Sequence, residues 1–172
     1  MKKLFALLFT LVLSATAQAT PAFSWGGSDY YVTGALHWNE AEAEAVTMGG
    51  HLVTINSAEE QAAIMGVFGG VLGNLPLYWI GLNDAAVEGT WAWASGEAVT
   101  YTNWAPAEPN NSGVGGEDYV NLNAYPNGAW NDLWDMSIAG IVEVKQEVPE
   151  PSSLALVGLA LAGLAAARRR KI

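Results

Sequence analysis

Apolar residues recur at helical spacing in two segments of the first half of the chain. Over residues 38–48 they fall every three to four positions, which predicts a helix that the glycine pair at 49–50 ends. Ser57, with Glu60 three residues later, has the pattern of a capping box and predicts the start of a second helix. The apolar side of that helix includes residues 64–68, and another glycine pair closes it. The first half therefore predicts two amphipathic helices.

Short apolar or alternating runs predict strands around and after these helices. Residues 20–28 are expected to form a loose lead-in. Residues 100–116 are rich in Pro, Gly and Asn and predict a loop longer than ordinary connections. Two early helices followed by an antiparallel set of strands indicate an α+β fold. The predicted strands are 30–36, 52–55, 78–82, 90–94, 118–122, 129–131 and 138–144.

Residues 1–19 are interpreted as a secretory signal peptide. Two lysines at 2–3 precede an apolar run over 4–13, and residues 17–19 (Ala-Gln-Ala) offer a cleavage site. The run is shorter than the ~20 apolar residues of a membrane-spanning helix. A non-cleaved anchor is the alternative. We expect the chain to be exported across the inner membrane.

Residues 149–172 form a second signal in three parts. Pro-Glu-Pro at 149–151 precedes an apolar run over 154–167 and four cations at 168–171. This layout resembles the PEP-CTERM sorting signal of Gram-negative bacteria, which a membrane protease of the exosortase type cuts. The resemblance implies that residues 154–167 anchor the protein transiently as a transmembrane helix, before delivery to the cell envelope or extracellular matrix. A plain tail anchor is the alternative.

The segment between the two signals, residues 20–148, is strongly acidic. Of the seven Lys and Arg in the chain only Lys145 lies there, whereas all seventeen Asp and Glu fall between residues 29 and 150. Such a surface repels nucleic acid and anionic membranes and suits divalent cations or neutral ligands. A solvated acidic surface without a ligand is the alternative. The length of this segment fits one domain with a single core.

Six motifs in this segment resemble those of the C-type lectin-like domain, in order and in spacing. The resemblance runs from about residue 30 to 143 and implies the C-type lectin-like fold: two helices, antiparallel sheets and a long calcium-binding loop. Such a domain is a binding module. The motifs are WNEA at 38–41, GGHL at 49–52, WIGL at 79–82, EGTW at 88–91, EPN at 108–110 and WND at 130–132.

The two disulfides of the resembled family are missing, because the chain has no cysteine. Ala45 and Val142 stand at one pair of bridge positions, and we expect an apolar contact there. Tyr119 and Asp135 stand at the other pair, where we expect a hydrogen bond to tie the two segments. Each absent bridge would contribute ~2–4 kcal/mol, so stability must come from packing and bound metal.

The resemblance also implies a calcium site that binds sugar. Calcium takes ~6–8 oxygen ligands from carboxylates, amide carbonyls and water. In the family the peptide bond before Pro109 is cis, which turns both flanking side chains the same way. The alternative is a solvated loop. The implied ligands of calcium and sugar supply three carboxylates and two amides, and they are Glu108, Asn110, Glu117, Asn131 and Asp132.

The ligand class follows from the EPN motif. In the resembled family Glu-Pro-Asn is associated with mannose, glucose and fucose types, whereas Gln-Pro-Asp is associated with galactose. The implied partner is thus a mannose-type glycan or an exopolysaccharide. An auxiliary calcium site is also implied, and it is weakened because Asn111 replaces an aspartate. Its residues are Asp84, Glu88, Asn111, Glu117 and Asp118.

Two other functions are weighed against a lectin. An enzyme is not expected, since no cysteine is present and His37 and His51 both flank the first helix, far in sequence from the loop. Glu108 and Glu117 resemble the carboxylate pair of a glycosidase, but the accompanying amides suit coordination better than proton transfer. The stronger rival is a lectin-like module that binds a protein or surface without sugar. Its interface would use tryptophans whose alternative role is core packing: Trp25, Trp104 and Trp134.

Overall fold

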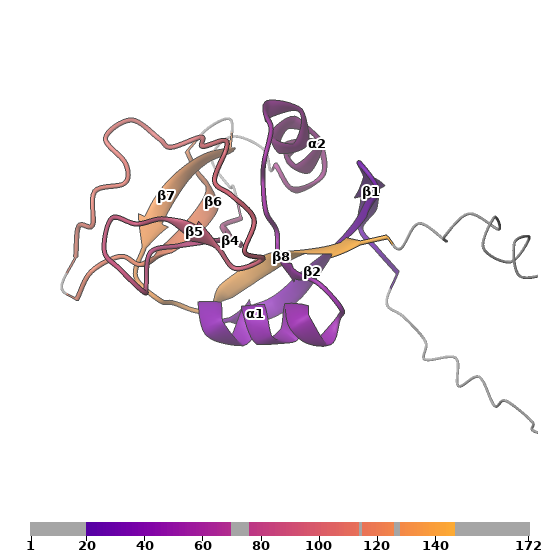
Figure 1. Ribbon diagram of the computed structural model, residues 1–172, viewed down its shortest axis with the longest axis horizontal. Helices are drawn as coiled ribbons and strands as arrows, with labels where there is room; N and C mark the ends of the chain where they lie inside the picture. Colours follow the sequence, from indigo (N-terminus) through magenta and orange to yellow (C-terminus); the bar gives the residue numbers. More distant parts are fainter. Residues whose placement is uncertain (1–19, 70–75, 114, 126–127, 147–172) are drawn as a thin grey trace, which may run out of the picture.

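The computed structural model describes residues 20–69, 76–113, 115–125 and 128–146, and Figure 1 shows their arrangement. Two helices and eight strands form an α+β domain, as predicted. Both terminal signals lie outside the described residues. In chain order the elements are β1 (Phe23–Trp25), β2 (Ser28–Leu36), α1 (Trp38–Thr47), β3 (His51–Leu52), α2 (Ala58–Phe68), β4 (Tyr78–Asn83), β5 (Ala92–Trp93), β6 (Tyr119–Tyr125), β7 (Ala129–Leu133) and β8 (Ile138–Lys145).

The strands form one mixed sheet in the order β1-β2-β8-β4-β6-β7, with β3 paired to β8 and β5 to β4. Strands β4 and β8 run parallel, and the other named pairs are antiparallel. Ser28 lies opposite Lys145, and the Gln146 N–H donates to the Gly27 carbonyl at 2.9 Å. The two ends of the described domain therefore meet at one end of the molecule, which we call the terminal pole. The opposite end, with β6, β7 and the loop 100–118, is the loop pole (Figure 1).

Helix α1 packs on β2 and β8, whereas α2 lies beside β1 on the other side of β8 (Figure 1). Helix α2 begins as predicted, because the Ser57 hydroxyl accepts the N–H of Glu60 at 3.1 Å. The second hydrogen bond of the predicted capping box, from the Ser57 N–H to the Glu60 side chain, is wrong. The Glu60 carboxylate turns into the domain and accepts the Asn56 N–H at 2.9 Å and the Tyr30 hydroxyl at 2.8 Å. The Glu60 carboxylate therefore binds the backbone N–H of the residue before Ser57 and a distant tyrosine hydroxyl, instead of the Ser57 N–H.

The WIGL segment in β4 is the centre of the core. Trp79 is fully buried, and its indole N–H donates to the Leu36 carbonyl at 3.1 Å. Gly81 is required by a close approach, since a Cβ at this position would lie 2.5 Å from the carbonyl oxygen of Leu52. The Gly81 N–H instead donates to the Val53 carbonyl at 2.9 Å. Glycine therefore lets β4 pass directly against the segment after β3.

Several predicted boundaries are wrong, and β2, β6 and β7 are longer than predicted. The expected lead-in contains β1, which forms a hairpin with β2 and stacks the Phe23 ring on Tyr30 at 4.4 Å. The strand predicted over 52–55 is the two-residue β3, although residues 53–55 are buried. The strand predicted over 90–94 is shortened to β5. Val53 and Ala94 still form backbone hydrogen bonds to neighbouring segments, but the regular ladder covers only two residues in each of β3 and β5.

The two pairs of residues at the absent disulfide positions have different surroundings. Ala45 on α1 and Val142 on β8 are both fully buried, and these two elements pack on each other, so both positions lie in the apolar interior. The predicted Tyr119–Asp135 hydrogen bond is wrong within the described residues. Tyr119 accepts from the Asn39 amide at 3.1 Å, and Asp135 accepts from the Trp38 N–H at 2.8 Å. Both residues are tied separately to the start of α1.

Candidate functional site

The loop at the loop pole is seated along β7. The N–H of Ala105 donates to the Trp130 carbonyl at 2.8 Å, and the N–H of Trp130 donates to the Asn103 carbonyl at 2.8 Å. Two residues beyond Trp130, Asp132 is 1% exposed. These contacts hold the start of the loop beside the WND motif.

Asp132 fastens the EPN segment to the sheet. Its Oδ1 accepts the N–H of Asn110 at 3.1 Å, and its Oδ2 accepts the N–H of Asn111 at 2.7 Å. Hydrogen bonds from N–H groups to an ionised carboxylate are worth ~1.5–3 kcal/mol each. The buried carboxylate therefore organises two consecutive residues of a segment that has no regular secondary structure.

Glu117 holds the other side of the same loop. It is 3% exposed, and its Oε2 accepts the N–H of Ser112 at 2.9 Å. The Ser112 N–H also lies 2.7 Å from the Asn110 Oδ1, and the Glu117 N–H donates to the Asn111 Oδ1 at 2.7 Å. The structure thus links three of the five predicted calcium ligands through backbone amides of residues 110–112.

The remaining two predicted ligands stand next to this network. The Glu108–Pro109 bond is cis, as the family resemblance implied, and the Glu108 N–H donates to the Ala105 carbonyl at 3.0 Å. Asn131 lies opposite Asn121 in the β6–β7 ladder, and its amide N–H₂ lies 3.4 Å from the Asn121 Oδ1. Glu108 precedes the anchored segment and Asn131 precedes Asp132 along β7.

The charge at this pole has no basic side chain to balance it. Burial raises the pKa of the Glu117 carboxyl, the Ser112 N–H opposes this effect and the Asp132 charge adds to it. Lys145 is the one Lys or Arg between residues 20 and 146, and it pairs with Glu97 at the terminal pole at 2.7 Å. Buried carboxylates whose partners are neutral amides fit a hard divalent cation.

The predicted calcium site depends on amide ligands as well as on carboxylates. Within the described part of the chain, no three His, Cys, Asp or Glu side chains gather in an arrangement that would hold a metal. Three of the predicted ligands are carboxylates and two, Asn110 and Asn131, are amides. The residues present therefore fit calcium, which accepts amide oxygens, better than metals that prefer nitrogen or sulfur.

The auxiliary calcium residues include a buried carboxylate, Asp84, that is only partly hydrogen-bonded among the described residues. Asp84 is 2% exposed, and its Oδ2 accepts the Gly89 N–H at 2.7 Å. Its Oδ1 is buried and has no hydrogen-bond partner among the described residues. Burial raises the pKa of Asp84, and the charge of Asp118 adds to the rise. Partial desolvation and the charges of Asp84 and Asp118 likewise raise the pKa of the exposed Glu88.

Gly116 shows how closely this set is packed. Its φ is +90°, and a Cβ there would lie 3.2 Å from the Asn111 Oδ1 and 3.6 Å from the Asp118 Oδ1. The predicted glycine-rich turn therefore brings Asn111 and Asp118 to the same place. An orphaned buried oxygen on Asp84 among like charges fits a cation here as well.

The histidines contact carboxylates outside the predicted calcium sites, and among the aromatic candidates Trp25 lies in β1 at the terminal pole. The His51 Nδ1 lies 2.6 Å from Glu42, whose other oxygen accepts the Leu52 N–H at 2.8 Å, so this pair joins α1 to β3. His37 faces Asp135 at 3.4 Å. Trp104 is half-buried against Trp91 and Trp130. By contrast, Trp25 is 38% exposed and Trp134 is 53% exposed.

Sequence reasoning missed two residues that shape the site. Ser112 contributes its N–H to both Asn110 and Glu117, and no side-chain pattern encodes a backbone donor. Asn121 is fully buried and supports Asn131. A signal for Asn121 was present, because an amide between the apolar neighbours of a strand needs a polar partner when it is buried.

Comparison with known proteins identifies the family. Residues 34–139 match the family described as "Lectin C-type domain", and the chain therefore belongs to the C-type lectin family. Residues 147–171 match the "PEP-CTERM protein-sorting motif", which supports an exported protein. Domains of this family are non-enzymatic binding modules, so the expectation that the chain is not an enzyme is confirmed. Neither described helix is long and apolar enough to cross a membrane.

Two similar curated proteins differ in their roles. The human "C-type lectin domain family 17, member A" is 38% identical over 104 residues, covering 60% of this chain and 25% of that protein. The "Type-2 ice-structuring protein" of Brachyopsis segaliensis is 35% identical over 99 residues, covering 58% of this chain and 54% of that protein. The chain thus spans about a quarter and about half of these relatives.

Solved structures support the fold. The carbohydrate-recognition domain of cow CD23, in the presence of GlcNAc2Man3 oligosaccharide, has a TM-score of 0.60 at 32% identity, covering 69% of this chain and 88% of that one. A calcium-independent type II antifreeze protein has a TM-score of 0.63 at 30% identity, covering 76% and 97%. A carbohydrate-recognition domain and a calcium-independent protein share this fold, so the fold alone determines neither the ligand nor the metal.

Proposed function

We propose that this exported protein is a calcium-dependent lectin for mannose-type or glucose-type sugars. The observation that carries the proposal is the anchoring of the EPN segment. Asp132 and Glu117, both buried, hold the amides of residues 110–112 at 2.7–3.1 Å with no basic side chain beside them. The loop is therefore shaped by carboxylates whose charge a calcium ion would balance.

The residues that would hold calcium are Glu108, Asn110, Glu117, Asn131 and Asp132, with the auxiliary residues as a weaker second set. When bound, calcium offers coordination positions that two neighbouring sugar hydroxyls can take in place of water. Glu108 and Asn110 flank the cis bond at Pro109. A carboxylate accepts hydrogen bonds from hydroxyl groups and an amide N–H₂ donates to them, so this pair selects the orientation of the hydroxyls.

Mannose-type specificity is supported by the EPN motif and by the relative studied with GlcNAc2Man3 oligosaccharide. The second candidate function is calcium-independent binding of a protein or surface. It is favoured by the similarity to a calcium-independent antifreeze protein and by the exposed Trp134. Chelation separates the two, because only the lectin loses its ligand when calcium is removed.

The test exchanges the two residues that flank Pro109. The double variant Glu108→Gln with Asn110→Asp keeps the summed charge of the loop and exchanges acceptor and donor positions. We expect loss of mannose-type binding by at least about tenfold and a gain for galactose, since a mispaired polar contact costs ~1–3 kcal/mol. Calcium affinity should change much less. Glycan arrays and calcium titrations measure both.

The matched control is Glu59→Gln, which changes an exposed carboxylate in the first turn of α2 and should leave sugar binding unchanged. A double variant that binds mannose-type sugars as before would show that the loop does not select the sugar. Binding of mannose-type sugars that survives chelator in the unaltered protein would exclude the calcium mechanism at the loop.

We also propose the processing of the chain. Residues 1–19 are removed on export, residues 20–148 form the lectin domain, and an exosortase-type protease cuts near the Pro-Glu-Pro at 149–151. Membrane contact through residues 154–167 is then transient. Mass spectrometry of the exported protein is expected to find no peptide from residues 154–172. A mature protein that retains those residues would instead be a tail-anchored lectin.

A further inference from the structure

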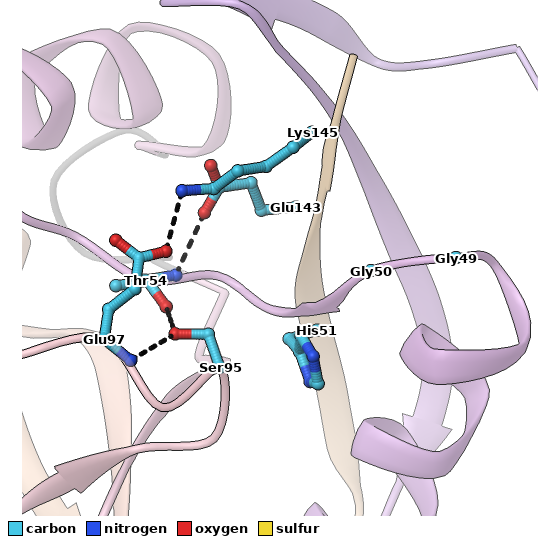
Figure 2. A pocket seen from close by; sticks show the side chains of 8 residues that line it. All are labelled: Gly49, Gly50, His51, Thr54, Ser95, Glu97, Glu143 and Lys145. Carbon is cyan, nitrogen blue, oxygen red and sulfur yellow. Dashed lines mark hydrogen bonds and ion pairs between the residues drawn. The ribbon is translucent and has the colours of Figure 1, made fainter. Parts of the chain in front are cut away.

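The terminal pole carries a cleft that the loop site does not use. Two cavities of about 320 Å³ and 340 Å³ adjoin there and share Thr54, Glu97, Glu143 and Lys145. Figure 2 shows these side chains converging in the first cavity, with Lys145 reaching Glu97 at 2.7 Å. We call the two cavities together the terminal cleft.

The terminal cleft has more negative than positive charge. Glu97 pairs with Lys145, whereas Glu143 and Glu60 accept hydrogen bonds from neutral groups. Glu143 accepts the Ser28 hydroxyl at 2.7 Å and the Thr54 N–H at 3.4 Å. Glu60 accepts a tyrosine hydroxyl and a backbone N–H, and its side chain lines the second cavity. Three carboxylates therefore face one ammonium group.

Asn56 provides an observation independent of charge. Its amide nitrogen donates to the Glu97 Oε2 at 2.7 Å, which fixes the orientation of the side chain. Its Oδ1 is buried and has no hydrogen-bond partner among the described residues, although Asn56 lines the second cavity. A buried acceptor without a partner is costly, and an O–H or N–H group of a ligand would satisfy it.

Trp25 forms an open wall of the same cavity. It lies in β1, is 38% exposed and lines the cavity together with the glycine pair of the β1–β2 turn. An indole face binds flat, weakly polar ring surfaces and attracts cations. The cavity volume is near the lower end of the range for ligand sites, ~300–1,000 Å³, which suits a single ring rather than a long chain.

We propose that the terminal cleft binds, without calcium, a saccharide unit that carries a free amino group. The ammonium group would face the carboxylates of Glu60 and Glu143, a hydroxyl would donate to the Asn56 Oδ1, and the sugar ring would lie on Trp25. Hydroxyl groups of Thr54 and Ser95, 2.7 Å apart, offer further donors and acceptors beside Glu97. The proposal involves other residues than the loop site and does not depend on it.

The experiment measures binding to the purified full-length chain by calorimetry with chelator present. The probes are a glucosamine trimer, an N-acetylglucosamine trimer and spermidine. We expect the glucosamine trimer to bind, and to bind more weakly as ionic strength rises, because salt screens the ammonium–carboxylate attraction. Neither the acetylated trimer nor spermidine should match it, since one lacks the charge and the other lacks the ring.

Two substitutions in the cleft wall locate the binding to the terminal cleft. Trp25→Ala should weaken the glucosamine trimer about threefold to fivefold through loss of the ring face. Glu97→Gln, which keeps an acceptor for Asn56, should weaken it by a similar factor. Trp134→Ala is the matched control, because it removes another exposed tryptophan that does not line the cleft, and it should leave this binding unchanged. Unaltered melting temperatures will show that the variants fold.

Each other outcome overturns the proposal. No binding of any probe would make the cluster a structural element alone. Equal binding of spermidine would make the cleft a cation site without saccharide recognition, and equal binding of the acetylated trimer would remove the role of the amine. Binding that Trp25→Ala and Glu97→Gln leave unchanged would place the sugar elsewhere. Sugar binding lost only on chelation belongs to the loop site.

Discussion

The two poles of the molecule bury carboxylates in different ways. At the loop pole, Asp132 and Glu117 meet backbone amides of a segment that has no regular secondary structure. At the terminal pole, Glu143 lies within β8, and Lys145 two residues later brings a positive charge beside it. The sheet holds the second group of carboxylates whether or not a ligand is bound. The first group has no Lys or Arg beside it, and under the proposed function its charge would be balanced by calcium.

This difference predicts where calcium contributes to stability. Calcium at about one hundred times its Kd stabilises a native site by ~2.7 kcal/mol, which for a domain of this size raises the Tm by about 10 °C. In Asp132→Asn the carboxylate that anchors Asn110 and Asn111 is neutralised. We expect calcium to raise the Tm of the unaltered protein by about that amount and to leave the variant nearly unchanged, as scanning calorimetry will measure.

The control for this prediction is the exposed Glu59→Gln, which should keep the full calcium response. A variant at Asp132 that retains the same rise in Tm would move the calcium site away from the WND motif. No rise in the unaltered protein would remove calcium from the loop pole altogether.

The second prediction concerns the pH dependence at the terminal pole. Burial raises the folded-state pKa of Glu143 above its ordinary 4.5, and nearby Glu60 adds to this, while the Ser28 hydroxyl and the Lys145 charge oppose it. The folded state then holds a proton that the unfolded chain has lost. The contribution of Glu143 to the free energy of unfolding therefore increases as pH falls through its folded pKa, and is complete below 4.5.

Urea denaturation at several pH values with chelator present measures this effect. Glu143→Gln should lose the part of the pH dependence that Glu143 supplies, whereas Glu59→Gln should keep it. An identical pH dependence in Glu143→Gln and the unaltered protein would show that the Glu143 carboxyl titrates alike in both states, despite its burial.

The smallest effect is expected for the ion pair between Lys145 and Glu97. The Lys145 side chain is 65% exposed, and exposed pairs contribute ~0–1 kcal/mol. We expect Lys145→Met to change the free energy of unfolding by less than about 1 kcal/mol, and Lys145→Arg to change it less still. A loss of several kcal/mol in urea denaturation would mean that the terminal pole depends on its cation as strongly as we propose the loop pole to depend on calcium.

Local patterns in the sequence determined the helices and the central strand. Ser57 begins α2, the apolar face of residues 38–45 faces the core, and Trp79 is buried as the WIGL motif predicted. These features depend on neighbours three or four residues apart, or on the burial of single large side chains, and both are written in the order of residues. The resemblance of six ordered motifs predicted the lectin fold for the same reason.

The partners of polar groups were decided by the tertiary structure. Glu60 turned from its own helix to Tyr30, and Tyr119 and Asp135 reached the start of α1 rather than each other. Ser112 became a shared donor at the loop. Asp135 lies 97 residues from Trp38 in the chain, so no local sequence pattern predicts their contact. A buried polar group takes whichever partner the packed chain brings within about 3 Å, and only the assembled sheet determines which one that is.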